Sequence, residues 1–361
     1  MGVTVSIVGA GHCGCAFAAD LLNRGASVLL YAHPQHERNI DAIRQQGHLA
    51  STGAIRGCFS PRLSTSIAEA VQFSRYLVIT VPAYGHDAII AELAKFDLHD
   101  HIVLCITGNF FSLVARRHLN ALAVIETATS PFASRVVDGE VKILGIKKIL
   151  PTASLPIDLP LERRIQLEAL FSMPLEWRAN VLEIGLMCIT GVIHPIPMLM
   201  NAGWIESSSG QFYFYREGMS PSVVKVIEQV DTERQQIARR FGLDTRSMLD
   251  LMNAYYGESY ESFEAFARQT SEHNSVRVTP PNLRSRFIDQ DVPYVLVPWF
   301  ELGRKVGVHC PTIEAIIRLA SIVRDTDYRE VGRNLHSLGM HTPTKDEILI
   351  MVGQPSLKLA S

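Results

Sequence analysis

Three residues in the second half of the chain have side chains that could transfer protons and hold a carboxylate. His194 lies in the apolar, proline-terminated segment 191–197, and histidine is the side chain most easily tuned to exchange protons near neutral pH. Asp291 precedes Pro293, and a fixed carboxylate can orient an imidazole. Arg286 could grip a substrate carboxylate through two parallel hydrogen bonds. Together these residues suggest a His–Asp pair with a carboxylate-binding arginine.

Each of the three also has a purely structural explanation. A histidine in an apolar segment is more often a satisfied core residue than a catalytic one. Asp291, Pro293 and Gly307 have the pattern of a helix that begins with an aspartate cap and an early proline and ends at a glycine. Arg286 could be a surface charge. Because capping and catalysis can coexist, the residue types alone leave both explanations open.

A glycine motif near the N-terminus predicts the element that would bind a dinucleotide. The apolar run 3–8 is typical of a buried parallel strand, and G-x-G-x-x-G follows it, before a helical pattern at 16–22 and a second strand at 26–31. The first glycine permits a tight turn, the second lets the backbone approach a pyrophosphate, and the third lets the helix pack close to the strand. The predicted cofactor loop comprises Gly9, Ala10, Gly11, His12, Cys13 and Gly14.

Further strand–loop units follow the glycine motif. Strands predicted at 76–81, 102–106 and 123–125 each run into a turn. In open α/β sheets the ligand lies across the carboxyl ends of the strands. This rule predicts that the nicotinamide side is lined by Val81, Pro82, Ala83 and Glu126. The alternative is that these residues belong to ordinary connecting loops.

The residues after the second strand bear on which dinucleotide is used. An NAD site normally has an acid there to bind the ribose hydroxyls, but the strand ends Tyr31-Ala32-His33-Pro34 without one. His33, His36 and Arg38 could instead bind a 2′-phosphate, which favours NADP(H). Glu37 and Asp41 lie nearby, so NAD remains the alternative.

Length and composition predict a globular protein of two domains. The chain has 361 residues, 47% of them hydrophobic, and its net charge of −2 provides no basic excess for a nucleic-acid partner. The strand–helix alternation fades after residue 150, and the pattern is mainly helical from residue 180. We therefore predict an α/β fold class: a Rossmann domain over 1–179 and a mainly α-helical substrate and catalytic domain over 180–361.

The cysteines and the apolar segments suggest a compartment. None of the six cysteines has zinc-type spacing, so no metal site is predicted, and most lie in apolar runs where a reduced thiol behaves as a small hydrophobic group. The sequence has no signal-peptide pattern and no uninterrupted apolar run of membrane-spanning length. We therefore expect a cytoplasmic protein without a membrane partner.

Several stretches along nearly the whole chain, taken in order, resemble the octopine/nopaline (opine) dehydrogenases. Length and motif order are most similar to the bacterial octopine synthase type. The stretches are GAGHCG (9–14), VPAYGH (81–86), ETATSPFASR (126–135), HPIPMLMNAG (194–203), FYREG (214–218), DTER (231–234), RFIDQDVP (286–293), GVHCPTIEAII (307–317) and YREVGRNLHSLGM (328–340).

The resemblance implies a reaction and a set of roles. Members of this family join the amino group of an amino acid to an α-keto acid, such as pyruvate or 2-oxoglutarate, and reduce the resulting imine with a nicotinamide hydride. The family's catalytic histidine falls on His194 and its partner carboxylate on Asp291. The carboxylate-binding arginine falls on Arg286, and Asn201 in the histidine motif is a further substrate-binding candidate.

The chain departs from the family pattern at two positions. Thr190 stands where many relatives have an asparagine one turn before the histidine. Asp289 is a second acid close to Asp291, so the choice between the two acids rests on motif register. The resemblance leaves the oligomeric state open, with a homodimer as one option.

Two other functions are compatible with a glycine loop of this kind. Ketopantoate and β-hydroxyacid reductases generally use a catalytic lysine on a helix of the second domain, but the only lysine between residues 149 and 304 is Lys225, outside any recognisable motif. A non-catalytic dinucleotide sensor would be expected to have lost His194, Arg286 or Asp291, and all three are present.

Overall fold

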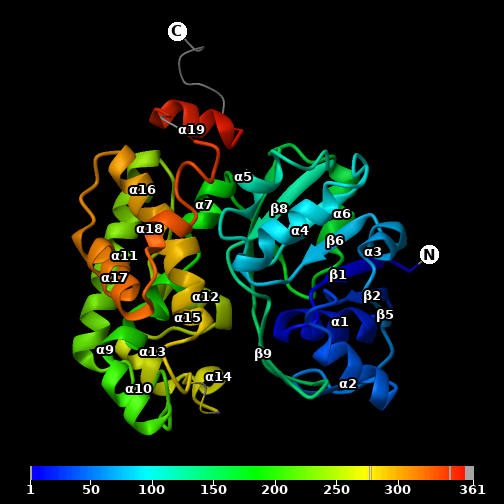
Figure 1. The fold of residues 1–361 in the computed structure, drawn as a ribbon, viewed down its shortest axis with the longest axis horizontal. Helices are drawn as coiled ribbons and strands as arrows, with labels where there is room; N and C mark the ends of the chain where they lie inside the picture. The colour runs from blue at the N-terminus through cyan, green and yellow to red at the C-terminus, as the bar shows by residue number, and fades with distance from the viewer. Residues whose placement is uncertain (1, 276, 278, 341–342, 354–361) are drawn as a thin grey trace. The chain divides into compact units, whose positions relative to one another are not determined.

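The fold consists of two compact units, which the computed structural model describes over residues 2–275, 277, 279–340 and 343–353. The chain divides between residues 181 and 182. Strands are confined to the first unit, whereas the described part of the second unit consists of helices and connecting segments (Figure 1). The predicted fold class, a Rossmann-type domain followed by a mainly helical domain, is confirmed.

The first unit is built on an eight-stranded sheet. All of its neighbouring strands are parallel except β8 and β11, which pair antiparallel. In spatial order the strands are β12 (Leu175–Trp177), β11 (Leu150–Leu155), β8 (Ala123–Thr127), β7 (Ile102–Cys105), β6 (Tyr76–Ile79), β1 (Thr4–Val8), β2 (Ser27–Tyr31) and β5 (Arg62–Ser64). The helical elements of this unit are α1 (His12–Asn23), α2 (Arg38–Gln46), α3 (Ile67–Phe73), the 3-10 turn η1 (Ala83–Gly85), α4 (His86–Leu93), α5 (Phe111–Ala115) and α6 (Leu161–Glu168).

A second, four-stranded sheet was not anticipated from the sequence. Its order is β4 (Gly57–Phe59), β3 (Leu49–Gly53), β10 (Glu140–Ile146) and β9 (Phe132–Val137). These strands are short or alternate between buried and exposed residues, so they lack the continuous apolar runs that mark the strands of the main sheet.

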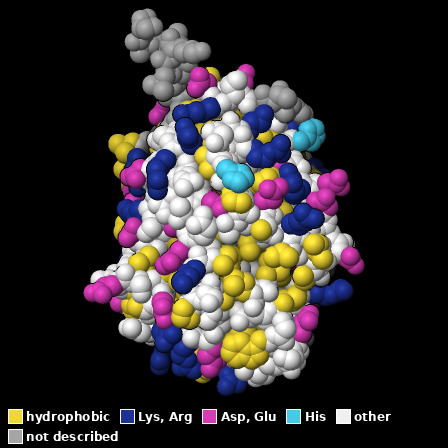
Figure 2. All heavy atoms as spheres, turned by 90° about the vertical axis from the view of Figure 1, so that its left-hand side faces the viewer, with side chains coloured by type: hydrophobic (Ala, Val, Ile, Leu, Met, Phe, Trp, Pro, Cys, Tyr) yellow, Lys and Arg dark blue, Asp and Glu magenta, His cyan; other side chains and the backbone are white. Residues whose placement is uncertain are grey.

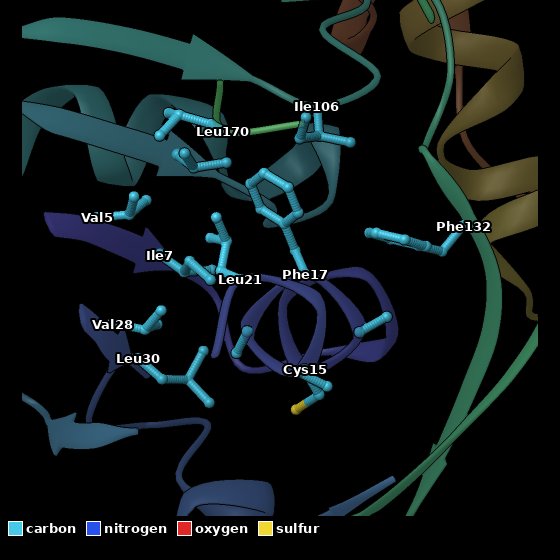
Figure 3. Close-up of a cluster of buried hydrophobic side chains, with 14 of the residues drawn as sticks. Val5, Ile7, Cys15, Phe17, Leu21, Val28, Leu30, Ile106, Phe132 and Leu170 are labelled. Atoms are coloured by element: carbon cyan, nitrogen blue, oxygen red, sulfur yellow. The ribbon is translucent and has the colours of Figure 1, made fainter. Parts of the chain in front are cut away.

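Helix α1 is buried because it packs against both sheets. All residues from Gly14 to Leu21 are buried, and the Phe17 ring lies 5.2 Å from the ring of Phe171 and 6.1 Å from that of Phe132 on β9. Figure 3 shows Phe17 among side chains of β1, β2 and β9. This double contact fixes the helix whose first residues form the glycine loop.

The second unit is a set of helices around α11. Its elements are α7 (Val181–Leu186), α8 (Thr190–Ile193), α9 (Pro195–Met200), α10 (Ala202–Ser208), α11 (Pro221–Phe241), α12 (Met248–Tyr256), α13 (Phe263–Gln269), α14 (Ser271–Asn274), α15 (Arg286–Asp289), the π-helical turn η2 (Val292–Leu296), α16 (Val297–Lys305), α17 (Pro311–Arg324), α18 (Tyr328–Val331) and α19 (Lys345–Met351).

The DTER motif on α11 has a structural role. Arg234 is fully buried and donates to Asp231 Oδ1 at 2.6 and 2.8 Å and to the carbonyl oxygens of Leu186 and Arg246. Glu233 accepts hydrogen bonds from backbone amides in the first turn of α17. A buried charge is tolerated only when it is paired and hydrogen-bonded in this way, so the motif ties α11 to its neighbours.

The segment Val181–Met200 is apolar enough to resemble a membrane-spanning stretch. Its most apolar 18-residue window has a mean hydropathy of 1.6, and 89% of that window is buried inside the protein. It comprises α7, α8 and α9, and it carries His194. Its apolar composition is therefore accounted for by its place in the protein core.

Candidate active site

His194 and Asp291 form a buried pair in the second unit. His194 Nδ1 lies 2.6 Å from Asp291 Oδ2, and the two side chains are 11% and 2% exposed. His194 lies between α8 and α9, immediately before the proline that begins α9, while Asp291 lies between α15 and η2. The short contact fixes the imidazole orientation and turns Nδ1 toward the carboxylate, which leaves Nε2 as the other ring nitrogen.

The expected helix cap at Asp291 is not formed. Asp291 precedes η2 but makes no capping hydrogen bond with its side chain. Its carboxylate instead accepts from Thr190 Oγ1 at 3.0 Å, in addition to facing His194. Thr190, the departure from the family pattern, thus holds the second oxygen of Asp291 and supports the carboxylate in the orientation that faces the imidazole.

Asp289, the competing acid, is engaged elsewhere. Arg324 donates to its carboxylate at 2.8 and 3.2 Å, and the Tyr328 hydroxyl donates at 2.5 Å. Burial, followed by the bond to Asp289, raises the pKa of Tyr328, and the hydrogen bond to Asp289 raises the pKa of Arg324. Asp291 is therefore the carboxylate that pairs with His194.

Two phenylalanines that the sequence analysis did not single out enclose the imidazole. The Phe287 ring stacks on His194 with centroids 3.8 Å apart and planes 7° apart, and Phe214 lies 6.3 Å away edge-on. Arg286 Cζ lies 5.6 Å from the centre of the same Phe287 ring. Phe287 thus links His194 to the exposed Arg286. The sequence signal that could have identified Phe287 is its position in the RFID motif, between Arg286 and Asp289.

Asn201 uses its amide group within the protein. Its Nδ2 donates to Pro197 O at 2.9 Å and to Gly218 O at 2.8 Å. These bonds join the end of α9 to the FYREG turn, whose Phe214 contacts His194. The amide nitrogen of Asn201 therefore stabilises the backbone around His194. Of the two predicted substrate-binding residues, Arg286 is the stronger candidate, because its guanidinium is exposed.

The glycine loop of the first unit has the shape that a dinucleotide requires. A Cβ added at Gly14 would overlap the carbonyl oxygen of Gly9 and lie 2.8 Å from Thr80 Oγ1, whereas a Cβ at Gly11 would meet no atom within 4 Å. Gly9 has a φ of 126°, which favours glycine. The loop is thus closely packed on its inner side and open at Gly11, where a pyrophosphate would approach the positive end of α1.

Strand β9 and the preceding loop hold the next residues of the motif. His12 Nδ1 accepts from Val136 N at 2.8 Å, and Ser134 Oγ donates to His12 O at 3.0 Å. Ser130 Oγ lies 3.4 Å from Cys13 Sγ. The ETATSPFASR stretch therefore braces the loop from outside the main sheet.

The residues predicted to line the nicotinamide side occupy different environments. Val81–Ala83 follow β6, and the Val81 side chain packs against Gly9. Glu126, on β8, is fully buried, and its carboxylate accepts from the amides of Phe110 and Ser112 at 3.0 and 2.5 Å. That carboxylate holds the start of α5, which gives Glu126 a structural role at the end of its strand.

No acid stands directly after β2, at the position that an NAD site would use. Two acids follow within ten residues, and Glu37 forms no ion pair with any residue that the structure describes. Asp41 pairs with Arg44 at 2.6 Å. Arg38 Nη2 lies 2.8 Å from Asp138 Oδ1, with side chains 84% and 71% exposed, and His33 accepts from the amide of Gln35. Because exposed ion pairs contribute little, Arg38 could exchange Asp138 for a ligand phosphate at small cost.

Two of the cysteines are buried thiols with raised pKa values. Burial, followed by the neighbouring Cys13, raises the pKa of Cys15 to about 12, and burial raises that of Cys310 to about 12, so both thiols stay protonated. No group of His, Cys, Asp or Glu with metal-binding geometry occurs within the described ranges.

A Rossmann unit with this glycine loop, followed by a helical unit with a buried His–Asp pair, defines a class: a two-domain, NAD(P)-dependent oxidoreductase. Residues 177–324 match the family model described as NAD/NADP octopine/nopaline dehydrogenase, alpha-helical domain, and residues 5–147 match that of ketopantoate reductase. The chain belongs to the octopine/nopaline (opine) dehydrogenase family, oxidoreductases that act on CH–NH donors.

Membership rests on full-length relatives. The chain is 32% identical to opine dehydrogenase of Arthrobacter sp. (strain 1C) over 93% of this chain and 95% of the relative. It is 30% identical to Protein ocs of Agrobacterium tumefaciens (strain Ach5), covering 96% and 98%. A solved octopine dehydrogenase in complex with NADH and agmatine shares the fold, with a TM-score of 0.74 at 15% identity over 98% of both chains.

The match of the first unit to ketopantoate reductase does not extend to the chemistry of that class. Lys225, the only lysine available on the helices between residues 149 and 304, is exposed on α11. The family model of the second unit is that of the opine dehydrogenases, so the reductase alternative is not favoured.

Proposed function

We propose that this chain uses NADPH to condense the amino group of an amino acid with an α-keto acid and reduce the product. The observation that carries the proposal is the 2.6 Å contact between His194 Nδ1 and Asp291 Oδ2, buried beside the Arg286–Phe287 pair, in a chain of this family. Such a pair can exchange protons with a substrate near neutral pH.

The proposed reaction has three steps. The amine nitrogen attacks the keto carbon to give a carbinolamine, which loses water to form an imine. The bound nicotinamide dinucleotide supplies a hydride to the imine carbon. With one proton delivered to the imine nitrogen, the products are a secondary amine that keeps the carboxylates of both substrates, water and the oxidised dinucleotide.

His194 would carry the protons of these steps. Because Nδ1 faces Asp291, exchange with the substrate falls to Nε2. This nitrogen can accept a proton from the substrate ammonium, which frees the amine for attack, and can donate a proton to the departing hydroxyl. Asp291 would stabilise the imidazolium while Thr190 holds the carboxylate in place. Arg286 would bind the carboxylate of the keto acid and orient its carbon for attack.

The first test of this reaction is its requirement for two organic substrates. NADPH consumption is expected only when an amino acid and a keto acid are present together, because the hydride acceptor is the imine formed from both. A matrix of amino acids against pyruvate and 2-oxoglutarate, followed by absorbance at the NADPH band, measures this directly. Equal oxidation of NADPH by the keto acid alone would contradict the proposal and favour a ketone reductase.

We also propose that NADP(H) is preferred over NAD(H), with Arg38 as the residue that recognises the 2′-phosphate. Loss of one charge-assisted contact is worth about 1.5–3 kcal/mol, so Arg38→Gln is expected to raise the KM for NADPH by roughly tenfold or more. The KM for NADH should stay unchanged. The matched control is Arg44→Gln, whose partner is Asp41 on the same helix.

Steady-state kinetics with both dinucleotides separates the outcomes of this cofactor test. If Arg38→Gln raised the KM for NADPH and for NADH equally, Arg38 would contribute to the fold or to non-specific electrostatic attraction of both dinucleotides, and not to recognition of the 2′-phosphate. A wild-type preference for NADH would overturn the NADP assignment itself.

The remaining expectations concern surroundings and partners. The buried, protonated thiols of Cys15 and Cys310 agree with a reducing, cytoplasmic location. The partners proposed are the small-molecule substrates, without nucleic acid or membrane. A homodimer stays a prediction, which the molar mass in solution would decide.

A further inference from the structure

A hollow with a volume of about 500 Å³ lies in the helical unit. It is formed by the end of α16, by α18 and by the loop that follows α18. It shares no residue with the His194 site. We call this hollow the basic basin. It is lined by Glu301, Arg304, Lys305, Arg329, Asn334, Leu335, His336 and Met340.

The basic basin carries an excess of positive charge. Three permanently cationic side chains face one carboxylate, that of Glu301, and His336 adds a titratable group. Figure 2 views the side of the molecule on which α16 and α17 lie in Figure 1, and Lys, Arg and His side chains gather on its upper part. A concave surface lined mainly by one sign of charge concentrates the opposite ion.

The cations are held in place by their own contacts. The guanidiniums of Arg304 and Arg329 both lie over the Phe300 ring, with Cζ 5.9 and 4.7 Å from its centre. Glu301 reaches them only loosely, at 3.5 and 3.9 Å, and Arg329 also lies 3.5 Å from Glu314. Long, partly exposed ion pairs of this kind are weak, so a ligand anion could replace them.

Lys305 adds a charge that the fold does not use. It is exposed in the last turn of α16, and it forms no ion pair with any residue that the structure describes. Its favourable interaction with the negative end of the helix is small. A third exposed cation beside two arginines raises the positive potential of the hollow, which an anion shared among them would neutralise.

The loop that closes the basin is firmly built. Asn334 donates from its amide to the carbonyl oxygens of Arg329 and Glu330 and accepts from the amide of Ser337. Leu335 and Met340 are buried beneath it, 6% and 1% exposed. The basic basin thus combines a mainly polar, cationic lining with a floor of two buried apolar residues, Leu335 and Met340, and a concave surface of this kind attracts an anionic ligand.

We propose that the basic basin binds a small molecule with at least two negative charges, carried by phosphate or carboxylate groups. The two arginines can grip one oxyanion through their paired N–H groups, and Lys305 and His336 can bind a second oxyanion of the same ligand. The apolar floor accommodates the carbon skeleton between the charged groups.

The test uses pyrophosphate and, separately, citrate, titrated calorimetrically into protein that holds one equivalent of NADP⁺ so that the glycine loop is filled. Wild type is expected to bind at least one probe saturably. The double variant Arg304→Gln/Lys305→Gln should weaken that binding by about tenfold or more, as expected for lost charge-assisted contacts. Tighter pyrophosphate binding would indicate a phosphate ester as the natural ligand, and tighter citrate binding a polycarboxylate.

The matched control is Arg239→Gln/Arg240→Gln, which removes two cations from the last turn of α11 in the same unit. It should bind both probes like wild type. Absence of saturable binding to wild type, or equal weakening in the two double variants, would overturn the proposal. If the basin variant does not fold, Lys305→Gln, which breaks no described ion pair, is expected to weaken binding roughly threefold.

Discussion

Replacing His194 with alanine is expected to lower turnover by about two to four orders of magnitude, the usual contribution of a positioned acid–base group. The same variant should bind NADPH with wild-type affinity, because the glycine loop is built entirely by the first unit. Single-turnover kinetics and a fluorescence titration of NADPH measure the two quantities separately. The reason for the split is that His194 is assigned to proton exchange and makes no part of the dinucleotide loop.

The controls for this variant address folding and charge. Phe287 packs on the imidazole at 3.8 Å, so alanine leaves a cavity, and His194→Gln preserves volume while removing the acid–base function. Both variants should lose turnover to a similar degree. His309→Ala, which removes an exposed histidine of the same unit, should have no effect. Turnover within threefold of wild type in His194→Gln would show that this histidine is a structural core residue.

The parts of the molecule that the sequence predicts well are those whose signal is local. The glycine loop, its strand and its helix follow one another within 31 residues, and each residue type has a backbone reason at its place. The helical character of the second unit is likewise predicted by the spacing of its apolar residues. The family motifs then bring His194 and Asp291 together, although 97 residues separate them in the chain.

The parts that the sequence leaves open depend on contacts between distant segments. Asp289 and Asp291 stand two positions apart, and motif register alone selects Asp291. The physical reason for that choice is visible only in their partners, Arg324 and His194. Strands β3 and β10 pair although they lie far apart in the sequence, so no local sequence pattern predicts their pairing. Glu126 looks like a ligand-binding acid from its place at a strand end, yet its carboxylate turns to the backbone of α5.

Replacing Gly14 with alanine is expected to cost about 3 kcal/mol of unfolding free energy or more, because the obstacle to the new Cβ is backbone. The added methyl would overlap Gly9 O and approach Thr80 Oγ1 to 2.8 Å. Since Thr80 Oγ1 itself donates to Gly9 O at 2.8 Å, neither group can withdraw without breaking the turn. The loop would open, and NADPH affinity should fall by about a hundredfold or more, as expected for lost backbone contacts to a charged group.

Gly11→Ala separates the fold of this loop from its contact with the cofactor. A Cβ there meets no protein atom within 4 Å, and the backbone φ of −85° suits alanine. Thermal unfolding without cofactor should therefore match wild type, whereas Gly14→Ala should unfold about 5–10 °C lower. A loss of NADPH affinity in Gly11→Ala without loss of stability would mean that the dinucleotide passes directly over residue 11. Wild-type affinity in both variants would mean that the dinucleotide binds elsewhere, because Gly14 is needed to close the turn and Gly11 is needed to admit the pyrophosphate.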